Sequence, residues 1–234
     1  MKINKQSSTY TVIYIIVMVV IVGVALAYTA TSLKPEQEAN ANKDKMSQIL
    51  ASVNVYPDAK EIIPEFEKLI TAQYIVSPDG QAKEGDAFAT DVAAEVKKPE
   101  AERSLPLYEC TLQDGSRKYI IPLSGNGLWG PIWGYISVDA DGSTVYGAYF
   151  AHQGETPGLG AEIEKTAFSG QFKGLSLFID NAFKPISVMK KGQTPADGSD
   201  FVDGISGGTI TSKGVNDMLH NCLEPYAKFL EGLK

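Results

Sequence analysis

The sequence of 234 residues contains few of the side chains that most often bind transition metals. It has two cysteines, Cys110 and Cys222, and two histidines, His152 and His220. Two cysteines cannot form a cysteine-only structural zinc site, and two histidines add few further ligands. The composition therefore argues against a zinc enzyme. A disulfide between the two cysteines and a pair of buried free thiols both remain open, because their separation along the chain does not give their distance in space.

Basic side chains are also few compared with acidic ones. The chain has 21 Lys and Arg against 28 Asp and Glu, a formal net charge of −7. Sequence-independent nucleic-acid binding requires clustered positive charge, so no nucleic-acid partner is expected. A content of 44% apolar and 21% charged residues excludes a disordered polymer and allows a globular domain with a sizeable core.

One long segment lacks charge altogether. No charged residue lies between Lys5 and Lys34, and residues 11–30 are apolar at 17 of 20 positions. Twenty helical residues span about 30 Å, the thickness of the hydrocarbon core of a bilayer. A cleaved signal peptide is the alternative, because Ala25-Leu26-Ala27 fits the small-x-small cleavage pattern. The run is longer than a typical h-region, however, which favours a retained transmembrane helix at 11–30 in contact with membrane lipid.

The charges on either side of this segment predict its orientation. Lys2 and Lys5 place residues 1–10 in the cytoplasm, although Lys34 and Lys43 weaken the asymmetry. The rest of the chain is then extracytoplasmic, on the periplasmic side of the inner membrane, and the protein is single-pass. Three of the 21 basic residues and none of the 28 acidic ones lie in the first 34 positions, so the exported part carries 18 − 28 = −10. The segment has no ionisable side chain with which to carry an ion.

The exported part begins with helical patterns. Residues 31–55 are expected to form a polar linker at 34–42 and a helix, whose apolar face follows from the i, i+3, i+4, i+7 spacing at 46–53. Apolar residues at 62–70 predict a second short helix that tolerates Pro64 in its first turn. The segment 85–102 is charged and weakly periodic, and it is expected to be a loop or a marginal helix.

Strand patterns follow. Asp114-Gly115 and Asp141-Gly142 predict the turns of two β-hairpins, and residues 175–179 and 186–190 resemble two short strands. The carboxyl end has helical spacing, with Ser212 or Thr211 as the expected N-cap and a kink or division at Pro225. The predicted fold of residues 56–234 is α+β, an antiparallel, hairpin-rich sheet flanked by helices.

The segment Asp203–Ser212 (DGISGGTITS) is the first candidate site. Two glycines leave backbone N–H groups unobstructed, the hydroxyls offer donors, and a helix N-terminus adds partial positive charge, which together suit a phosphate group. A loop that merely caps the helix is the alternative. The segment is neither a Walker loop nor a dinucleotide-binding fingerprint.

Two further segments are rich in glycine. In HQGETPGLGAE (152–162), Leu159 projects from a tight turn and is a candidate lid for a flat aromatic ligand, the alternative being a long exit from a hairpin. The segment SGNGLWGPIWGY (124–135) holds both tryptophans. Its Trp129 could be a stacking surface, although a core aromatic is the more common role.

These three segments, in this order and before a terminal helix, resemble the NqrC family, the flavin-carrying subunits of the Na⁺-translocating NADH:quinone reductase. The resemblance spans nearly the whole chain and includes the single N-terminal anchor. The related RnfG proteins of the Rnf complex share the ETPGLG and SGAT-type motifs but are less similar in the GLW…WGY segment. One departure is visible, because Gly208 stands where the family usually has Ala; one small residue replaces another, and the function is expected to survive.

The resemblance implies FMN bound covalently by a phosphoester to a threonine, which maps to Thr209, with Thr211 as the nearby rival. It implies a flavin transferase that uses flavin adenine dinucleotide for maturation, and other membrane subunits as partners. The site residues that it implies hold the phosphate or contact the flavin. They are Ser206, Gly207, Gly208, Thr211, Glu155, Thr156, Gly158, Leu159, Gly160 and, more weakly, Trp129.

The implied function is an electron relay within a membrane complex that reduces ubiquinone. The relay takes electrons from an iron–sulfur centre and passes them to a second covalent FMN, which is held by the NqrB protein of the same complex. The flavin supplies the redox chemistry, so neither His nor Cys is required and no residue of this chain is catalytic alone. The alternatives are an RnfG-type electron-transport flavoprotein and an anchored interaction module without flavin. A hydrolase that uses Ser206 is remote, because no base constellation accompanies it.

Overall fold

The computed structural model describes residues 7–234 of the chain, which divides into two units after Lys45. The first unit consists of most of one helix, α1 (Ser8–Ser52). By length and composition, α1 is the one helix of the described residues that could cross a membrane. Lys2 and Lys5, on which the predicted orientation depends, lie outside the described residues.

The predicted polar linker at residues 34–42 is wrong, because α1 continues through it and through Pro35. The segment after Pro35 is polar, but it consists largely of Glu, Gln, Ala and Lys, which favour helices. Proline removes one helical hydrogen bond without ending the helix at this position. Polarity alone was therefore a poor indicator of a break.

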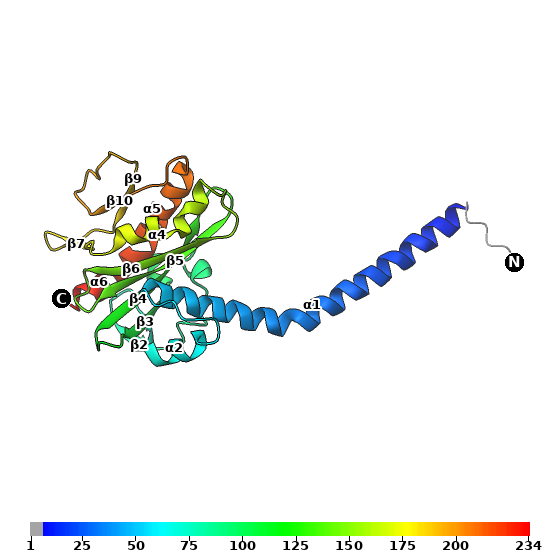
Figure 1. Ribbon diagram of the computed structural model, residues 1–234, viewed down its shortest axis with the longest axis horizontal. Helices are drawn as coiled ribbons and strands as arrows, with labels where there is room; N and C mark the ends of the chain where they lie inside the picture. The colour runs from blue at the N-terminus through cyan, green and yellow to red at the C-terminus, as the bar shows by residue number, and fades with distance from the viewer. Residues whose placement is uncertain (1–6) are drawn as a thin grey trace. The chain divides into compact units, whose positions relative to one another are not determined.

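A six-stranded antiparallel sheet forms the centre of the second unit, in the order β2-β1-β3-β4-β5-β6 (Figure 1). Both predicted hairpins are confirmed, with Asp114-Gly115 between β3 and β4 and Asp141-Gly142 between β5 and β6. The strands are β1 (Ile70–Val76), β2 (Ala82–Glu84), β3 (Leu105–Thr111), β4 (Arg117–Asn126), β5 (Pro131–Asp139) and β6 (Val145–His152).

Each face of this sheet is covered, as the alternation of side chains along β4 shows. Tyr119, Ile121 and Leu123 face a core shared with the long terminal helix α5 (Thr209–Leu223). Ile120 faces a second core made with the last turns of α1 and with α2 (Ile62–Leu69). A strand period of two thus supplies both cores, and the predicted α+β class is confirmed.

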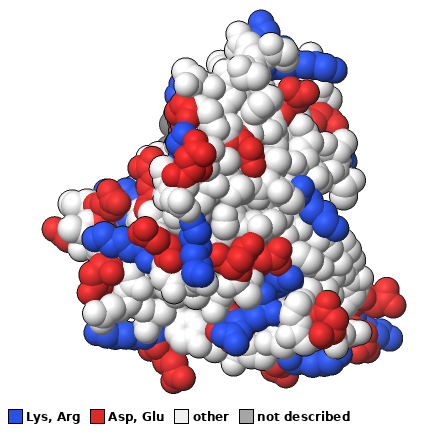
Figure 2. All heavy atoms as spheres, turned by 90° about the vertical axis from the view of Figure 1, so that its left-hand side faces the viewer, with Lys and Arg blue, Asp and Glu red and all other residues white. Residues whose placement is uncertain are grey.

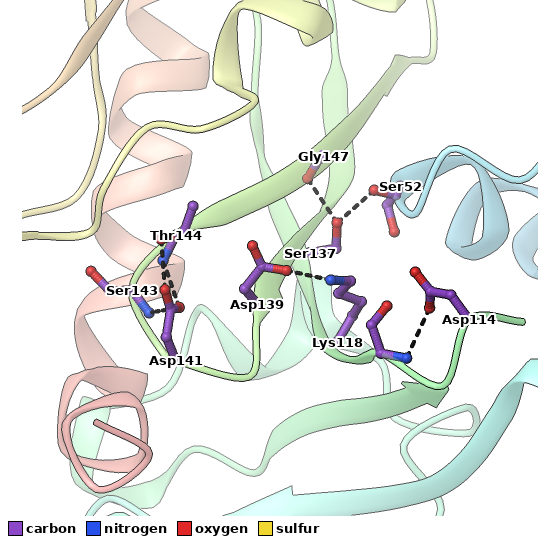
Figure 3. A network of polar contacts seen from close by, with 10 residues as sticks. Ser52, Asp114, Lys118, Ser137, Asp139, Asp141, Ser143, Thr144 and Gly147 are labelled. Atoms are coloured by element: carbon purple, nitrogen blue, oxygen red, sulfur yellow. Dashed lines mark hydrogen bonds and ion pairs between the residues drawn. The ribbon is translucent and has the colours of Figure 1, made fainter. Parts of the chain in front are cut away.

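The end of α1 is joined to the sheet by a hydrogen bond between Ser52 and Ser137 (Figure 3). The buried Ser137 hydroxyl donates to the carbonyl of Ser52 at 2.6 Å. A Cβ at Gly147 would lie 2.5 Å from the same carbonyl oxygen, so glycine is required for this close approach. Nearby, the largely buried Lys118 pairs with Asp139 and lies over the ring of Tyr146.

Short elements lie between β2 and β3 and between β6 and α5. The segment 85–102 contains one turn of helix and one 3₁₀ turn, in agreement with a marginal helix. The predicted strands at 175–179 and 186–190 correspond to two- and three-residue strands. These elements are α3 (Val92–Glu95), η1 (Glu100–Glu102), η2 (Gly160–Glu164), α4 (Thr166–Ser169), η3 (Gly170–Phe172), β7 (Phe178–Ile179), β8 (Ala182–Phe183), β9 (Ser187–Met189) and β10 (Phe201–Asp203).

Two helix boundaries differ from the sequence-based prediction. The second helix ends at Leu69, and Ile70 begins β1, because its backbone turns to an extended conformation to pair with β3. Helix α5 begins at Thr209 after Gly208, so neither Ser212 nor Thr211 is its N-cap. The predicted division at Pro225 is confirmed by η4 (Glu224–Tyr226), which separates α5 from α6 (Ala227–Glu231).

Candidate functional site

The first turn of α5 is the centre of the candidate site. Thr209 is the first helical residue and is exposed, and the two preceding residues are glycines. Gly207 has φ +77°, a conformation that favours glycine, and a Cβ there would lie 2.7 Å from Leu159 Cδ2. The N–H groups of the first turn have no intrahelical acceptor, so they are available to oxygen atoms of an anion beside Thr209.

The loop after β6 contacts the first turn of α5. Glu155 is buried, and its Oε2 accepts a hydrogen bond of 2.6 Å from the hydroxyl of buried Thr211. Its Oε1 accepts another, of 2.8 Å, from the backbone N–H of Trp129. A single carboxylate therefore joins all three segments that the sequence singled out.

His152, at the end of β6, holds the backbone of Glu155. Its Nδ1 accepts from the backbone N–H of Glu155 at 3.1 Å, and its Nε2 lies 3.5 Å from Glu164 Oε1. Acceptance at Nδ1 places the proton on Nε2, facing Glu164, in the neutral ring. His152 thus orients the start of the loop.

A pocket of about 210 Å³ lies between the loop and the helix. Gly160 is enclosed at its wall, because a Cβ there would overlap the side-chain oxygens of Glu155 and Thr211. Most of the predicted site residues line this pocket, together with two that the sequence did not suggest, Leu128 and Ile210. The lining residues are Leu128, Glu155, Thr156, Leu159, Gly160, Gly207, Gly208, Thr209, Ile210 and Thr211.

Apolar side chains stand exposed around this pocket. Leu128, Leu159 and Ile210 are 48%, 42% and 57% exposed, and Trp129 is 69% exposed. The common role of a tryptophan as a core aromatic is thus wrong for Trp129, because glycines on both sides leave it on an open turn. Exposed apolar residues that share a pocket rim suit a flat apolar ligand. In the sequence, Leu128 and Trp129 are adjacent and lie among glycines. This pattern was the signal that could have indicated Leu128.

Three predicted residues lie at the margin of this arrangement. Ser206 lines a neighbouring pocket on the other side of Thr209. Gly158 has φ +75° and shapes the turn before Leu159. Trp129 is tied to Glu155 through its backbone, while its side chain is outside the pocket lining.

The two cysteines are free and buried. Cys110 lies on the sheet face toward α1, and Cys222 lies in the core beneath α5. Burial raises the pKa of Cys110 to about 12 and that of Cys222 to about 11. The question left open by the sequence is resolved in favour of free thiols, which lie apart from the site.

Comparison with known proteins assigns the part of the chain that holds this pocket to a known domain family. Residues 127–224, which contain the segments 152–162 and 203–212 and all but the first three residues of the segment 124–135, match the family described as FMN-binding domain. The fold and this match thus define a domain of the FMN-binding class.

The relatives narrow this class further. The chain is 36% identical over 189 residues to NqrC of the Na⁺-translocating NADH-quinone reductase from Vibrio anguillarum, covering 74% of this chain and 73% of that one. The crystal structure of the corresponding protein from Parabacteroides distasonis is 51% identical, with a TM-score of 0.79 over 85% of this chain and 96% of that chain. The structure of Shewanella oneidensis NqrC, 22% identical with a TM-score of 0.67, shares the fold. The chain belongs to the NqrC family of the Na⁺-translocating NADH-quinone reductase.

Proposed function

We propose that this chain carries FMN joined through its phosphate to the hydroxyl of Thr209 and serves as an electron relay in a membrane-bound NADH:quinone reductase. The observation that carries the proposal is the placement of an exposed threonine at the start of α5, beside a pocket rimmed by exposed apolar side chains. Membership of the NqrC family and the match to the FMN-binding domain support the choice of ligand.

The residues present fit such a group. Gly207 and Gly208 leave room around the Thr209 hydroxyl, and the N–H groups of the first helical turn offer donors to phosphate oxygens. The helix macrodipole adds partial positive charge at the same place. Leu159 and Leu128 offer apolar contacts to the flavin ring. When bound, FMN supplies the electron-transfer chemistry, and the protein supplies binding and orientation.

The structure also favours Thr209 over Thr211 as the attachment point. Thr211 is 1% exposed, and its hydroxyl proton is used in the bond to Glu155. Thr209 is exposed, so the active site of a flavin transferase can reach it. We assign Thr211 a supporting role, in which its hydroxyl holds the Glu155 carboxylate in position.

In-gel flavin fluorescence under denaturing conditions tests the attachment. The full chain is expressed with a flavin transferase, and the expected result is a fluorescent band that is absent without the transferase. Thr209→Ala should abolish the band, whereas Thr211→Ser, which keeps the hydroxyl bonded to Glu155, should retain it. Release of all flavin on denaturation would overturn the covalent attachment, and absence of flavin altogether would favour the flavin-free interaction module.

The cellular context belongs to the same proposal. Helix α1 is compatible with a single-pass membrane anchor, and we place the second unit on the periplasmic side. The donor of electrons is an iron–sulfur centre of the membrane subunits, and the acceptor is a second covalent FMN in NqrB.

A fusion of alkaline phosphatase after Lys234 tests the orientation. The fusion should be active, since that enzyme matures in the periplasm, whereas an inactive fusion would contradict the proposed orientation. Co-purification with the reductase rather than an Rnf complex tests the assembly.

A further inference from the structure

A second pocket lies on the other side of Thr209. Its volume is about 360 Å³, and it shares Gly207 and Thr209 with the first pocket. It lies beside β9 and the first turns of α5. Its wall includes Val188, Ile205, Ser212 and Asn216. This volume is in the range of small-molecule sites, which begin at about 300 Å³.

Three lysines are among the residues that line this space, and we call it the lysine pocket. Lys190 and Lys191 follow β9, and Lys213 lies one helical turn after Thr209, on the same side of α5. Lys213 pairs with Asp217. Neither Lys190 nor Lys191 forms an ion pair with another residue between positions 7 and 234.

This concentration of basic charge contrasts with the rest of the chain. The formal net charge is −7. On the face shown in Figure 2, acidic and basic side chains are interspersed among uncharged residues. Three lysines around one pocket, two of them without an acidic partner, therefore mark a local site for an anion.

The proposed attachment releases an anion, which such a site would suit. Forming the ester creates a bond between Thr209 Oγ1 and the FMN phosphorus and breaks the phosphoanhydride bond of the flavin dinucleotide donor. The hydroxyl proton passes to a base of the modifying enzyme, and the other half of the donor leaves as a phosphate monoester. No atom changes its oxidation state. Negative charge develops on the leaving phosphate, and lysines stabilise such charge in phosphoryl transfer.

We infer that the lysine pocket binds the nucleoside monophosphate half of the flavin donor while Thr209 is modified. This inference rests on the proposed attachment at Thr209. Lys190 and Lys191 have flexible four-carbon stems that can reach the phosphate, while the apolar side chains Val188 and Ile205 offer contacts to a nucleoside. The unmodified protein thus contributes to binding the donor that modifies it.

Binding of AMP to the unmodified full chain in detergent tests the inference without any flavin. Equilibrium dialysis should show saturable binding that is about tenfold weaker in the Lys190→Ala, Lys191→Ala double variant, since hydrogen bonds to charged groups are lost. A matched control, Lys60→Ala with Lys83→Ala, removes the same charge outside the pocket lining and should bind AMP like the parent. Binding that is non-saturable, or equal in both variants, would overturn the inference.

The rate of flavin attachment provides a second, separate readout. With the transferase and limiting flavin adenine dinucleotide, the pocket variant should be modified more slowly and still reach the same final fluorescence. An unchanged rate would overturn the role in transfer. Binding of a poly-glutamate peptide to the lysine pocket, in the absence of any binding of AMP, would overturn it as well. Failure of the parent chain to take up flavin would instead overturn the attachment at Thr209, whatever the AMP result.

Discussion

The hydroxyl of Thr211 donates to Glu155 Oε2 at 2.6 Å, joining the first turn of α5 to the loop after β6. Both side chains are buried, at 1% and 5% exposure, so neither group can exchange this partner for water. The other oxygen of the same carboxylate accepts from the backbone of Trp129. Glu155 thus joins the segments around the pocket, which it also lines.

Glu155→Ala is expected to destabilise the fold by about 1–3 kcal/mol, because the buried Thr211 hydroxyl and the part-buried Trp129 N–H lose their acceptor. Urea unfolding of the full chain in detergent measures this loss. Flavin attachment at Thr209 should fall as well, since the loop no longer packs against α5. Glu155→Gln, which keeps one acceptor oxygen, should lie between the parent and the alanine variant. The exposed Glu231→Ala is the control, and an equal effect of both alanine variants would contradict this role.

The glycines of the loop after β6 differ in what surrounds them, which gives a second prediction. A Cβ at Gly160 would overlap Glu155 Oε2 and Thr211 Oγ1, whereas nothing lies within 4 Å of a Cβ at Gly154. Gly160→Ala should therefore cost about 1–3 kcal/mol, as overpacking in a filled region does, and should reduce flavin fluorescence in the gel. Gly154→Ala should change neither quantity. If the two variants unfold at the same urea concentration, the prediction that Gly160 is tightly packed is wrong.

Local patterns were sufficient to predict much of the fold. The Asp-Gly turns at 114 and 141 determined the two central hairpins, since the turn chemistry and the flanking alternation agree. The strand β1 was not predicted, because its sequence directly continues the apolar pattern of α2 and only pairing with β3 reveals it. Tertiary pairing overrode the local helical period at Ile70.

The site was predictable in part for a similar reason. The motif around Thr209 and the motif around Leu159 are each a continuous stretch of sequence, and the two residues line one pocket. The role of Glu155 depends on Thr211 and Trp129, which are distant in sequence, so only the folded chain brings the donors to the carboxylate. The lysine pocket likewise combines residues after β9 with a residue of α5, and no local pattern connects them.

The contact between Ser137 and the end of α1 gives a third prediction. Ser137→Ala removes a buried donor to the Ser52 carbonyl, which should cost about 1–3 kcal/mol in urea unfolding. Gly147→Ala should cost more, because its Cβ would press on the same carbonyl. The exposed Thr194→Ala is the control. Flavin attachment should persist in the Ser137 variant, since the contact lies outside the pocket lining, and its loss would contradict that separation.

The buried cysteines provide a test of the thiol state. With pKa values of about 12 and about 11, their thiolate fractions at pH 8 are about 10⁻⁴ and 10⁻³. Ellman's reagent should therefore leave the folded chain unlabelled at pH 8 and should label two thiols after unfolding in guanidinium. No labelling of the unfolded chain would mean that the cysteines form a disulfide after all.

The same thiols make stability depend on alkaline pH. Their pKa values are raised from an ordinary value of 9.0 by burial, so the folded state binds these protons more tightly than the unfolded state. Stability is fully present below pH 9 and falls as the pH rises through 9 toward 11 and 12, by at most about 1.4 kcal/mol per pH unit for each thiol. Urea unfolding between pH 8 and 10 measures the slope, in a window below the main titration of the buried tyrosines. The Cys110→Ala, Cys222→Ala double variant should be less stable at pH 8 but should lose less stability over this range, and an unchanged slope would contradict the assignment to the thiols.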